Sequence, residues 1–98
     1  MPKYGNRSIV YNAFLESGIT KVTNLGECTS LSDMCFGGCR NLTEVVLPTS
    51  CIEFESGVFR ECTNLSFINV ENLMYIGSSN FSNCTSLINP LYFKELLR

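Results

Sequence analysis

Six cysteines are the residues with the widest chemical range in this 98-residue chain. A thiolate can act as a nucleophile or a metal ligand, but a catalytic cysteine needs a general base beside it, most often a histidine. The sequence contains no histidine. Nucleophilic catalysis by a Cys–His or Ser–His pair is therefore excluded.

The spacing of the cysteines favours a structural role. Cys39, Cys62 and Cys84 follow one another at a nearly constant interval, and we expect them to be small buried side chains at equivalent positions. A disulfide between neighbours stays possible, because stacked strands lie about 5 Å apart, within the Cα range of a bridge. Zinc at Cys28, Cys35 and Cys39 would need a fourth ligand and lacks paired metal-binding motifs. We expect no metal and no other cofactor.

The carboxylates and glycines give no sign of an active site. Glu53 and Glu55 lie close together in the sequence on a segment expected to be exposed, which favours solvated charge over acid–base catalysis. Gly37 and Gly38 do not form a phosphate-binding loop and are better explained by a tight turn. The sequence therefore predicts a protein that is not an enzyme.

Composition and charge narrow the class of partner. The chain is 45% hydrophobic and 16% charged, which indicates a folded domain. Its net charge is −2 and its seven basic residues are scattered, so a nucleic-acid surface is not expected. No secretory signal and no apolar run of about 18 residues is visible, which predicts no membrane insertion and a cytoplasmic location or a place in an assembled particle.

These residues are positioned by a repeat with a period of about 23 residues, and a fixed period in this range is the signature of a solenoid. The pattern Phe-x-x-Cys-x-x-Leu-x-x-Val/Ile begins at Phe36, begins again at Phe59, and its first three positions return from Phe81. In a solenoid, equivalent side chains of successive repeats form ladders. Two ladders are expected in the core and one, of asparagines, on the turns: Phe36, Phe59 and Phe81; Leu42, Leu65 and Leu87; Asn41 and Asn64.

The repeat divides the chain into units of a single domain. Cys28-Thr29-Ser30-Leu31 copies Cys84-Thr85-Ser86-Leu87, so residues 25–35 are either the return half of an ordinary turn, which we favour, or a compressed extra turn. Asn89-Pro90 is a helix-start pair and predicts a short capping helix at the C-terminus. The expected units are a half-turn at 1–13, repeats at 14–35, 36–58 and 59–80, and a partial repeat with its cap at 81–98.

Together, these units and the segment Ile76-Gly77 before Phe81 resemble the BspA-type leucine-rich repeat family over about residues 9–88. The resemblance implies a right-handed solenoid of about four coils, with parallel strands on the concave side and irregular or short helical segments on the convex side. Ser17 departs from the pattern, because it stands where the other repeats have cysteine. Members of this family mostly serve as binding or adhesion surfaces, so the resemblance implies a binding protein without naming its ligand.

The outward face of the strands is the predicted binding site. Strands are expected at about 44–47 and 67–70, with Val45, Leu47, Ile68 and Val70 pointing inward and the alternate residues outward. An aromatic and an aliphatic residue would then be exposed, which suggests a partner site. The residues expected to bind a protein partner on this concave face are Lys21, Thr23, Glu44, Val46, Phe67 and Asn69.

A second hypothesis assigns the chain a structural role. Four coils form a stack of about 15–20 Å, near the minimum for a repeat array. So short an array suits a small subunit of a virion or other large assembly, held by contacts at its first and last coils.

Overall fold

In a computed structural model, residues 8–9 and 12–87 are described, and this part of the chain contains no helix. The predicted capping helix, at residues 88–98, lies outside the described residues. Each strand is only two residues long. The strands are Ser8–Ile9 (β1), Lys21–Val22 (β2), Ser30–Leu31 (β3), Glu44–Val45 (β4), Glu53–Phe54 (β5), Phe67–Ile68 (β6) and Tyr75–Ile76 (β7).

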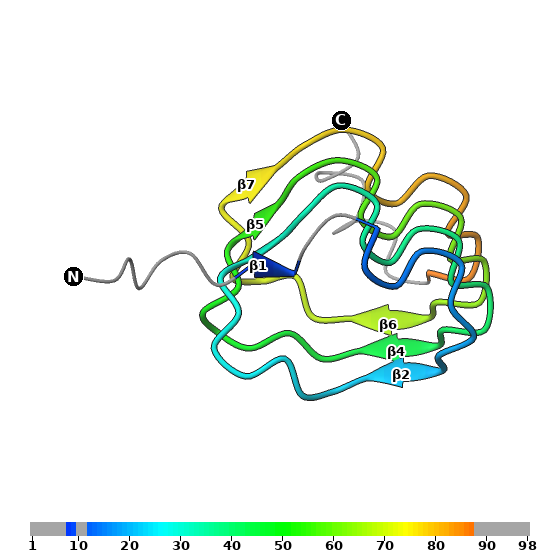
Figure 1. The fold of residues 1–98 in the computed structure, drawn as a ribbon, viewed down its shortest axis with the longest axis horizontal. Helices are drawn as coiled ribbons and strands as arrows, with labels where there is room; N and C mark the ends of the chain where they lie inside the picture. Colours follow the sequence, from blue (N-terminus) through cyan, green and yellow to red (C-terminus); the bar gives the residue numbers. More distant parts are fainter. Residues whose placement is uncertain (1–7, 10–11, 88–98) are drawn as a thin grey trace.

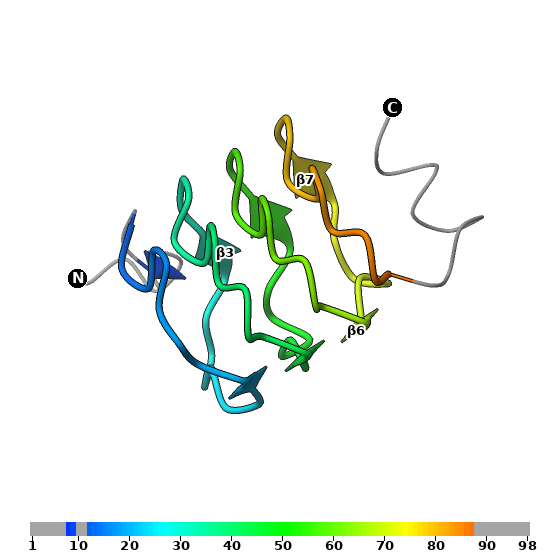
Figure 2. The same cartoon turned by 90° about the vertical axis from the view of Figure 1, so that its right-hand side faces the viewer.

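The strands form two parallel sheets, which we call sheet A (β1-β3-β5-β7) and sheet B (β2-β4-β6). Partners in each sheet are separated by the length of one sequence repeat, as in the pairs Leu31–Phe54 and Val45–Ile68. Each repeat therefore adds one strand to each sheet. Sheet B and the labelled strands of sheet A lie on different sides of the molecule in Figure 1, and successive repeats lie side by side in Figure 2.

The turns that lead from sheet A to sheet B are also bonded from one repeat to the next. The amide of Phe14 donates to the carbonyl of Cys35 at 2.7 Å, and the amide of Phe36 donates to that of Val58 at 3.0 Å. The backbone is therefore paired on three sides of each repeat, which aligns equivalent residues along the stack.

The structure contradicts one expectation, which concerns the side of the repeats opposite sheet B. Irregular or short helical segments were expected opposite the concave strands, but a second parallel sheet is found there. Each of its later strands places one large apolar residue toward the core: Leu31 and Phe54 are buried, and Ile76 is half-buried against them. Strands this short contain no alternation of polar and apolar residues long enough to be read from the sequence.

The predicted strands of sheet B are found, but they are shorter than expected. β4 ends at Val45 rather than at residue 47, and β6 ends at Ile68 rather than at residue 70. The amide of Leu47 donates to the Oδ1 atom of Asn69 at 2.6 Å instead of to a strand carbonyl. A side chain thus replaces the backbone partner and ends the sheet.

The core contains the predicted ladders. The Phe36 ring stacks on Phe59 with centroids 5.3 Å apart, and Phe59 stacks on Phe81 at 6.2 Å. Phe14 extends the stack, at 5.1 Å from Phe36. The four residues predicted to point inward from sheet B are all buried, and so are Leu42 and Leu65, while Leu87 is half-buried.

Residues 25–35 occupy the return half of an ordinary repeat. They contain β3, which pairs with β1 of the preceding repeat and with β5 of the following one. Cys28, which made an extra turn conceivable, donates its thiol to the Ser30 carbonyl at 3.2 Å and is buried.

Candidate functional site

The predicted site lies on the outer face of sheet B. The register aligns Lys21, Glu44 and Phe67 in one row across β2, β4 and β6. Lys21 Nζ lies 3.8 Å from Glu44 Oε1, and both side chains are solvent-exposed in part. The Phe67 ring, at the end of the row, is 50% exposed and has no aromatic or aliphatic neighbour in that row.

A second row of residues, each one repeat apart, lies two positions further along the chain and contains Thr23, Val46 and Asn69. Thr23 is exposed, and Val46 is 38% exposed. The predicted exposure of the two apolar residues on this face, Phe67 and Val46, is therefore confirmed. Asn69 is half-buried, and its Nδ2 atom donates to the Leu47 carbonyl at 3.0 Å while its Oδ1 atom accepts from the Leu47 amide. Its amide therefore fixes the corner after β4.

An apolar hollow of about 310 Å³ adjoins this face at the first repeat. Phe14, at its wall, is 40% exposed, whereas Phe36, one repeat later, is buried. The sequence pattern did not predict this hollow; the signal that could have found it is the position of Phe14 at the start of the first repeat. The lining residues are Phe14, Ile19, Lys21, Val22, Thr23, Asn24, Leu25 and Phe36.

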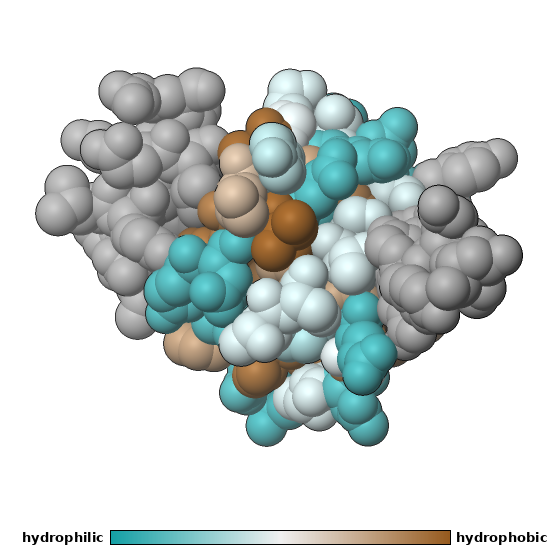
Figure 3. Space-filling view, turned by 90° about the vertical axis from the view of Figure 1, so that its left-hand side faces the viewer, coloured by the Kyte–Doolittle hydropathy of each residue, from teal (hydrophilic) through white to brown (hydrophobic). Residues whose placement is uncertain are grey.

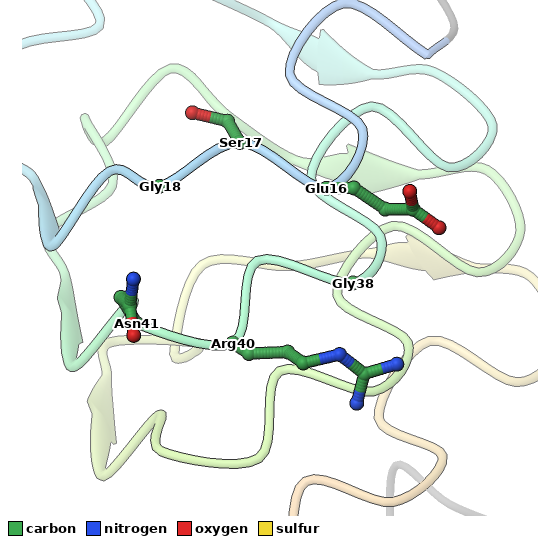
Figure 4. Close-up of a pocket in the computed structure, with 6 residues that line it drawn as sticks. All are labelled: Glu16, Ser17, Gly18, Gly38, Arg40 and Asn41. Atoms are coloured by element: carbon green, nitrogen blue, oxygen red, sulfur yellow. The ribbon is translucent and has the colours of Figure 1, made fainter.

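A polar hollow of about 480 Å³ lies between two neighbouring turns and includes Glu16, Ser17, Arg40 and Asn41 (Figure 4). The Ser17 hydroxyl points away from the head groups of Glu16 and Arg40. Ser17 Oγ accepts from the Ile19 amide at 3.2 Å, and the Arg40 guanidinium donates to Glu61 at 3.3 Å. These groups do not converge on a common point, so the hollow offers no nucleophile and base in contact.

The cysteines are free thiols, and all except the half-buried Cys84 are buried. Each thiol of the predicted ladder donates to the carbonyl of the phenylalanine one repeat earlier: Cys39 to Phe14 and Cys62 to Phe36, both at 3.1 Å, and Cys84 to Phe59 at 3.0 Å. A thiol at this position therefore pairs a turn carbonyl as well as filling space.

The electrostatics of four thiols oppose reactivity, whereas the hydrogen bond with Cys62 lowers the pKa of Cys39. Burial raises the pKa of Cys35 and the pKa of Cys51 to about 12, and burial raises the pKa of Cys84 to about 11. The pKa of Cys62 is raised by its hydrogen bond with Cys39 and by burial. Because only a thiolate attacks or binds a metal, these four side chains are inert at neutral pH.

Of the two residues of the predicted asparagine ladder, Asn64 bonds the neighbouring turn, since its Nδ2 atom donates to the Arg40 carbonyl at 2.7 Å. Ser86 follows in the next repeat and donates to the Thr63 carbonyl at 2.8 Å. Within residues 8–9 and 12–87, no three His, Cys, Asp or Glu side chains are placed to hold a metal ion. The same part of the chain has no helix able to span a membrane.

Comparison with known proteins gave one result. A family model described as "BspA type Leucine rich repeat region" matches residues 2–96 in six copies. No curated protein and no solved structure matches the chain.

Proposed function

Because the chain belongs to the BspA-type leucine-rich repeat family, we propose that it is a non-enzymatic protein-interaction module that binds a protein partner through the sheet B face. The observation that carries this proposal is the 50% exposure of Phe67 on a face that also exposes Val46. Large apolar side chains on an otherwise polar surface are typical of sites that a partner covers.

The proposal includes the finer architecture. We infer one domain over residues 1–98, wound as a right-handed solenoid of about four coils with sheet B on its concave side. The parallel register of both sheets and the stacked phenylalanine rings support this arrangement. A partner would then meet the three strands of sheet B at once, with Phe67 and Val46 as anchors.

Phe67 is the strongest candidate anchor. Covering the exposed half of a phenylalanine removes about 100 Å² of apolar surface from water, which is worth about 2.5 kcal/mol. The Lys21–Glu44 pair is exposed and contributes little energy, but it places a carboxylate next to Phe67 and an ammonium one strand further on, which constrains how a partner is oriented. Thr23 offers a hydroxyl at the rim, and Asn69 holds the corner of the sheet.

The test is a pair of variants on this face. Phe67→Asp and Val46→Lys should abolish co-purification of the proteins recovered with the wild-type chain from its native source, while the far-UV circular dichroism stays unchanged. Leu15→Asp is the matched control, because Leu15 is 39% exposed on a turn and lies outside the proposed face.

Retention of the same proteins by both sheet B variants would reject the proposal. The hypothesis that the chain is a subunit of a larger assembly stays a prediction. The oligomeric state and stability of the purified chain distinguish it from the interaction module. The subunit hypothesis requires a purified chain that is poorly stable alone, so a stable monodisperse monomer would argue against it.

A further inference from the structure

A second exposed apolar surface lies on sheet A, away from the proposed site. Met74 is 68% exposed and Tyr75 is 59% exposed, the two largest values among the large hydrophobic residues of the described chain. Both backbone amides donate to the carbonyl of the half-buried Ile52, at 2.8 and 3.0 Å, so the chain entering β7 is held beside the chain entering β5. Figure 3, which views the side where β1, β5 and β7 lie in Figure 1, shows hydrophobic side chains gathered in the middle of this face.

Carboxylates adjoin this apolar group. Glu53 is the register partner of Tyr75, and Glu55, the next alternate residue along the chain, is on the same face of sheet A. Asp33 is held nearby, because the Ser56 amide donates to its carboxylate at 2.8 Å and its own amide donates to Glu55 Oε1 at 3.2 Å. All three carboxylate residues are exposed.

Within residues 8–9 and 12–87, no basic side chain pairs with Glu53 or Glu55, although Arg60 lines the same hollow as Asp33. Lys21 lies on sheet B and pairs with Glu44. Arg40 and Arg60 lie on the turns, and both pair with Glu61, at 3.3 and 3.9 Å. The charge of the described residues is therefore segregated, with mixed charge on sheet B and only negative charge on sheet A.

We propose that the outer face of sheet A is a second interaction surface, which binds a basic protein segment with interspersed apolar side chains. We call it the acidic patch; it consists of Glu53, Glu55 and Tyr75 on the outer face, with the half-buried Ile52 and the exposed Met74 at its edge, just before β5 and β7. Met74 and Tyr75 cover the apolar side chains of the segment, and Glu53 and Glu55 pair with its lysines or arginines. Charge complementarity selects this occupant, because a nucleic acid or an acidic peptide would be repelled.

The chemistry also distinguishes this surface from sheet B. The sheet B row presents one anion beside its aromatic ring and one cation a strand further on, and it has no net charge. The acidic patch presents two carboxylates beside its aromatic ring and has no cation. The two faces therefore suit different partners, and the protein can join two proteins rather than bind one.

The test uses short fluorescein-labelled peptides and fluorescence anisotropy. The alternating peptide (Lys-Leu)4 should bind the full chain, and its dissociation constant should rise severalfold between about 50 and about 300 mM NaCl as salt screens the charges. The peptides (Glu-Leu)4 and (Lys-Ser)4 should bind at least tenfold more weakly, because the first reverses the charge and the second removes the apolar side chains.

Variants locate the binding surface. The double variant Met74→Ser, Tyr75→Ser should weaken binding of (Lys-Leu)4 at least tenfold. Glu53→Gln, which keeps the shape of the side chain, should weaken it about threefold. Phe67→Ser on sheet B should leave binding unchanged. Far-UV circular dichroism checks that each variant is folded.

The proposal is overturned if (Lys-Ser)4 binds as tightly as (Lys-Leu)4, since the interaction would then be charge alone. It is also overturned if Glu53→Gln and the double variant bind like the wild type, or if Phe67→Ser causes the same loss. Stronger binding after Lys3→Ser and Arg7→Ser would show that the chain's own basic residues occupy the patch, and this too rejects a separate partner.

Discussion

At the scale of single residues, backbone conformation and pairing decide which positions tolerate change. Nine of the described residues adopt positive φ, and only three of them are glycine: Gly26, Gly38 and Gly57. The others bear side chains in the left-handed region, such as Met34 at +58° and Glu61 at +62°. This conformation strains non-glycine residues by about 1 kcal/mol, so stacking of the repeats must supply the stability that offsets it.

Alanine substitutions at Gly77 and Gly26 distinguish the cost of a steric collision from the cost of backbone strain. A Cβ at Gly77 would collide with the Glu55 backbone carbonyl, which cannot rotate away. A Cβ at Gly26 meets no atom within 4 Å, although its φ is +62°. We expect Gly77→Ala to lower the free energy of unfolding in urea by about 2–3 kcal/mol, and Gly26→Ala to lower it by about 1 kcal/mol. Equal losses would contradict the close approach of β5 and β7.

Asn80 is the one polar side chain buried among the described residues. Its Nδ2 atom donates to the Glu55 carbonyl at 2.9 Å, and its Oδ1 atom accepts from the Val58 amide at 2.8 Å. Asn80→Val leaves both backbone groups without a partner and should cost about 2–4 kcal/mol in urea unfolding. The control Asn64→Ala removes one exposed hydrogen bond and should cost less than about 1 kcal/mol; a similar loss in both variants would refute a special role for Asn80.

At the scale of elements, the sequence predicts the features that follow from the repeat period. It does not predict strands that are too short to show an alternation of polar and apolar residues. The phenylalanine ladder and the inward residues of sheet B follow from residues one period apart, and both are found. Sheet A was missed, because Glu53–Phe54 and its partners are very short strands held by neighbours one repeat away. Hydrogen bonds between strands one repeat apart leave no local pattern of polar and apolar residues in the sequence.

The stack of rings should be most sensitive at its centre. Phe59 is buried between Phe36 and Phe81 and also contacts the tilted ring of Phe54 at 5.4 Å. Phe59→Ala should lower the free energy of unfolding by about 3–5 kcal/mol, enough to abolish a cooperative transition in a small domain. Phe14→Ala, at the exposed end of the stack, should cost less than about 2 kcal/mol. Equal sensitivity would mean that the rings do not share one core.

At the scale of the whole molecule, the repeat produces two parallel sheets whose outer faces expose side chains to solvent. Sequence reasoning placed Phe67 and Val46 outward correctly, since alternation from the buried Val45 and Ile68 fixes the face. It did not give the exposure of Met74 and Tyr75, because sheet A itself was not predicted.

The whole stack should also lose stability at alkaline pH, because the buried thiols hold their protons in the folded state. The pKa of Cys35 and the pKa of Cys51 are raised by burial to about 12, from an ordinary value near 9. Between these values the folded chain binds more protons than the unfolded chain, so the free energy of unfolding must fall as pH rises. Below about pH 8 the thiols are protonated in both states and contribute no pH dependence.

The urea midpoint should therefore be flat from about pH 6 to 8 and fall steadily from about pH 9 to 12. The variant Cys35→Ala lacks one such thiol and should be less stable at neutral pH. Over the alkaline range its free energy of unfolding should fall less steeply than that of the wild type. The difference in slope should be at most about 1.4 kcal/mol per pH unit, the contribution of one proton. Because the variant keeps every tyrosine and lysine, the difference in slope comes from Cys35 and from the thiols that interact with it, Cys28 and Cys39. Parallel curves for the two proteins would mean that Cys35 ionises as readily in the folded chain as in the unfolded one, and that the core around it is open to water.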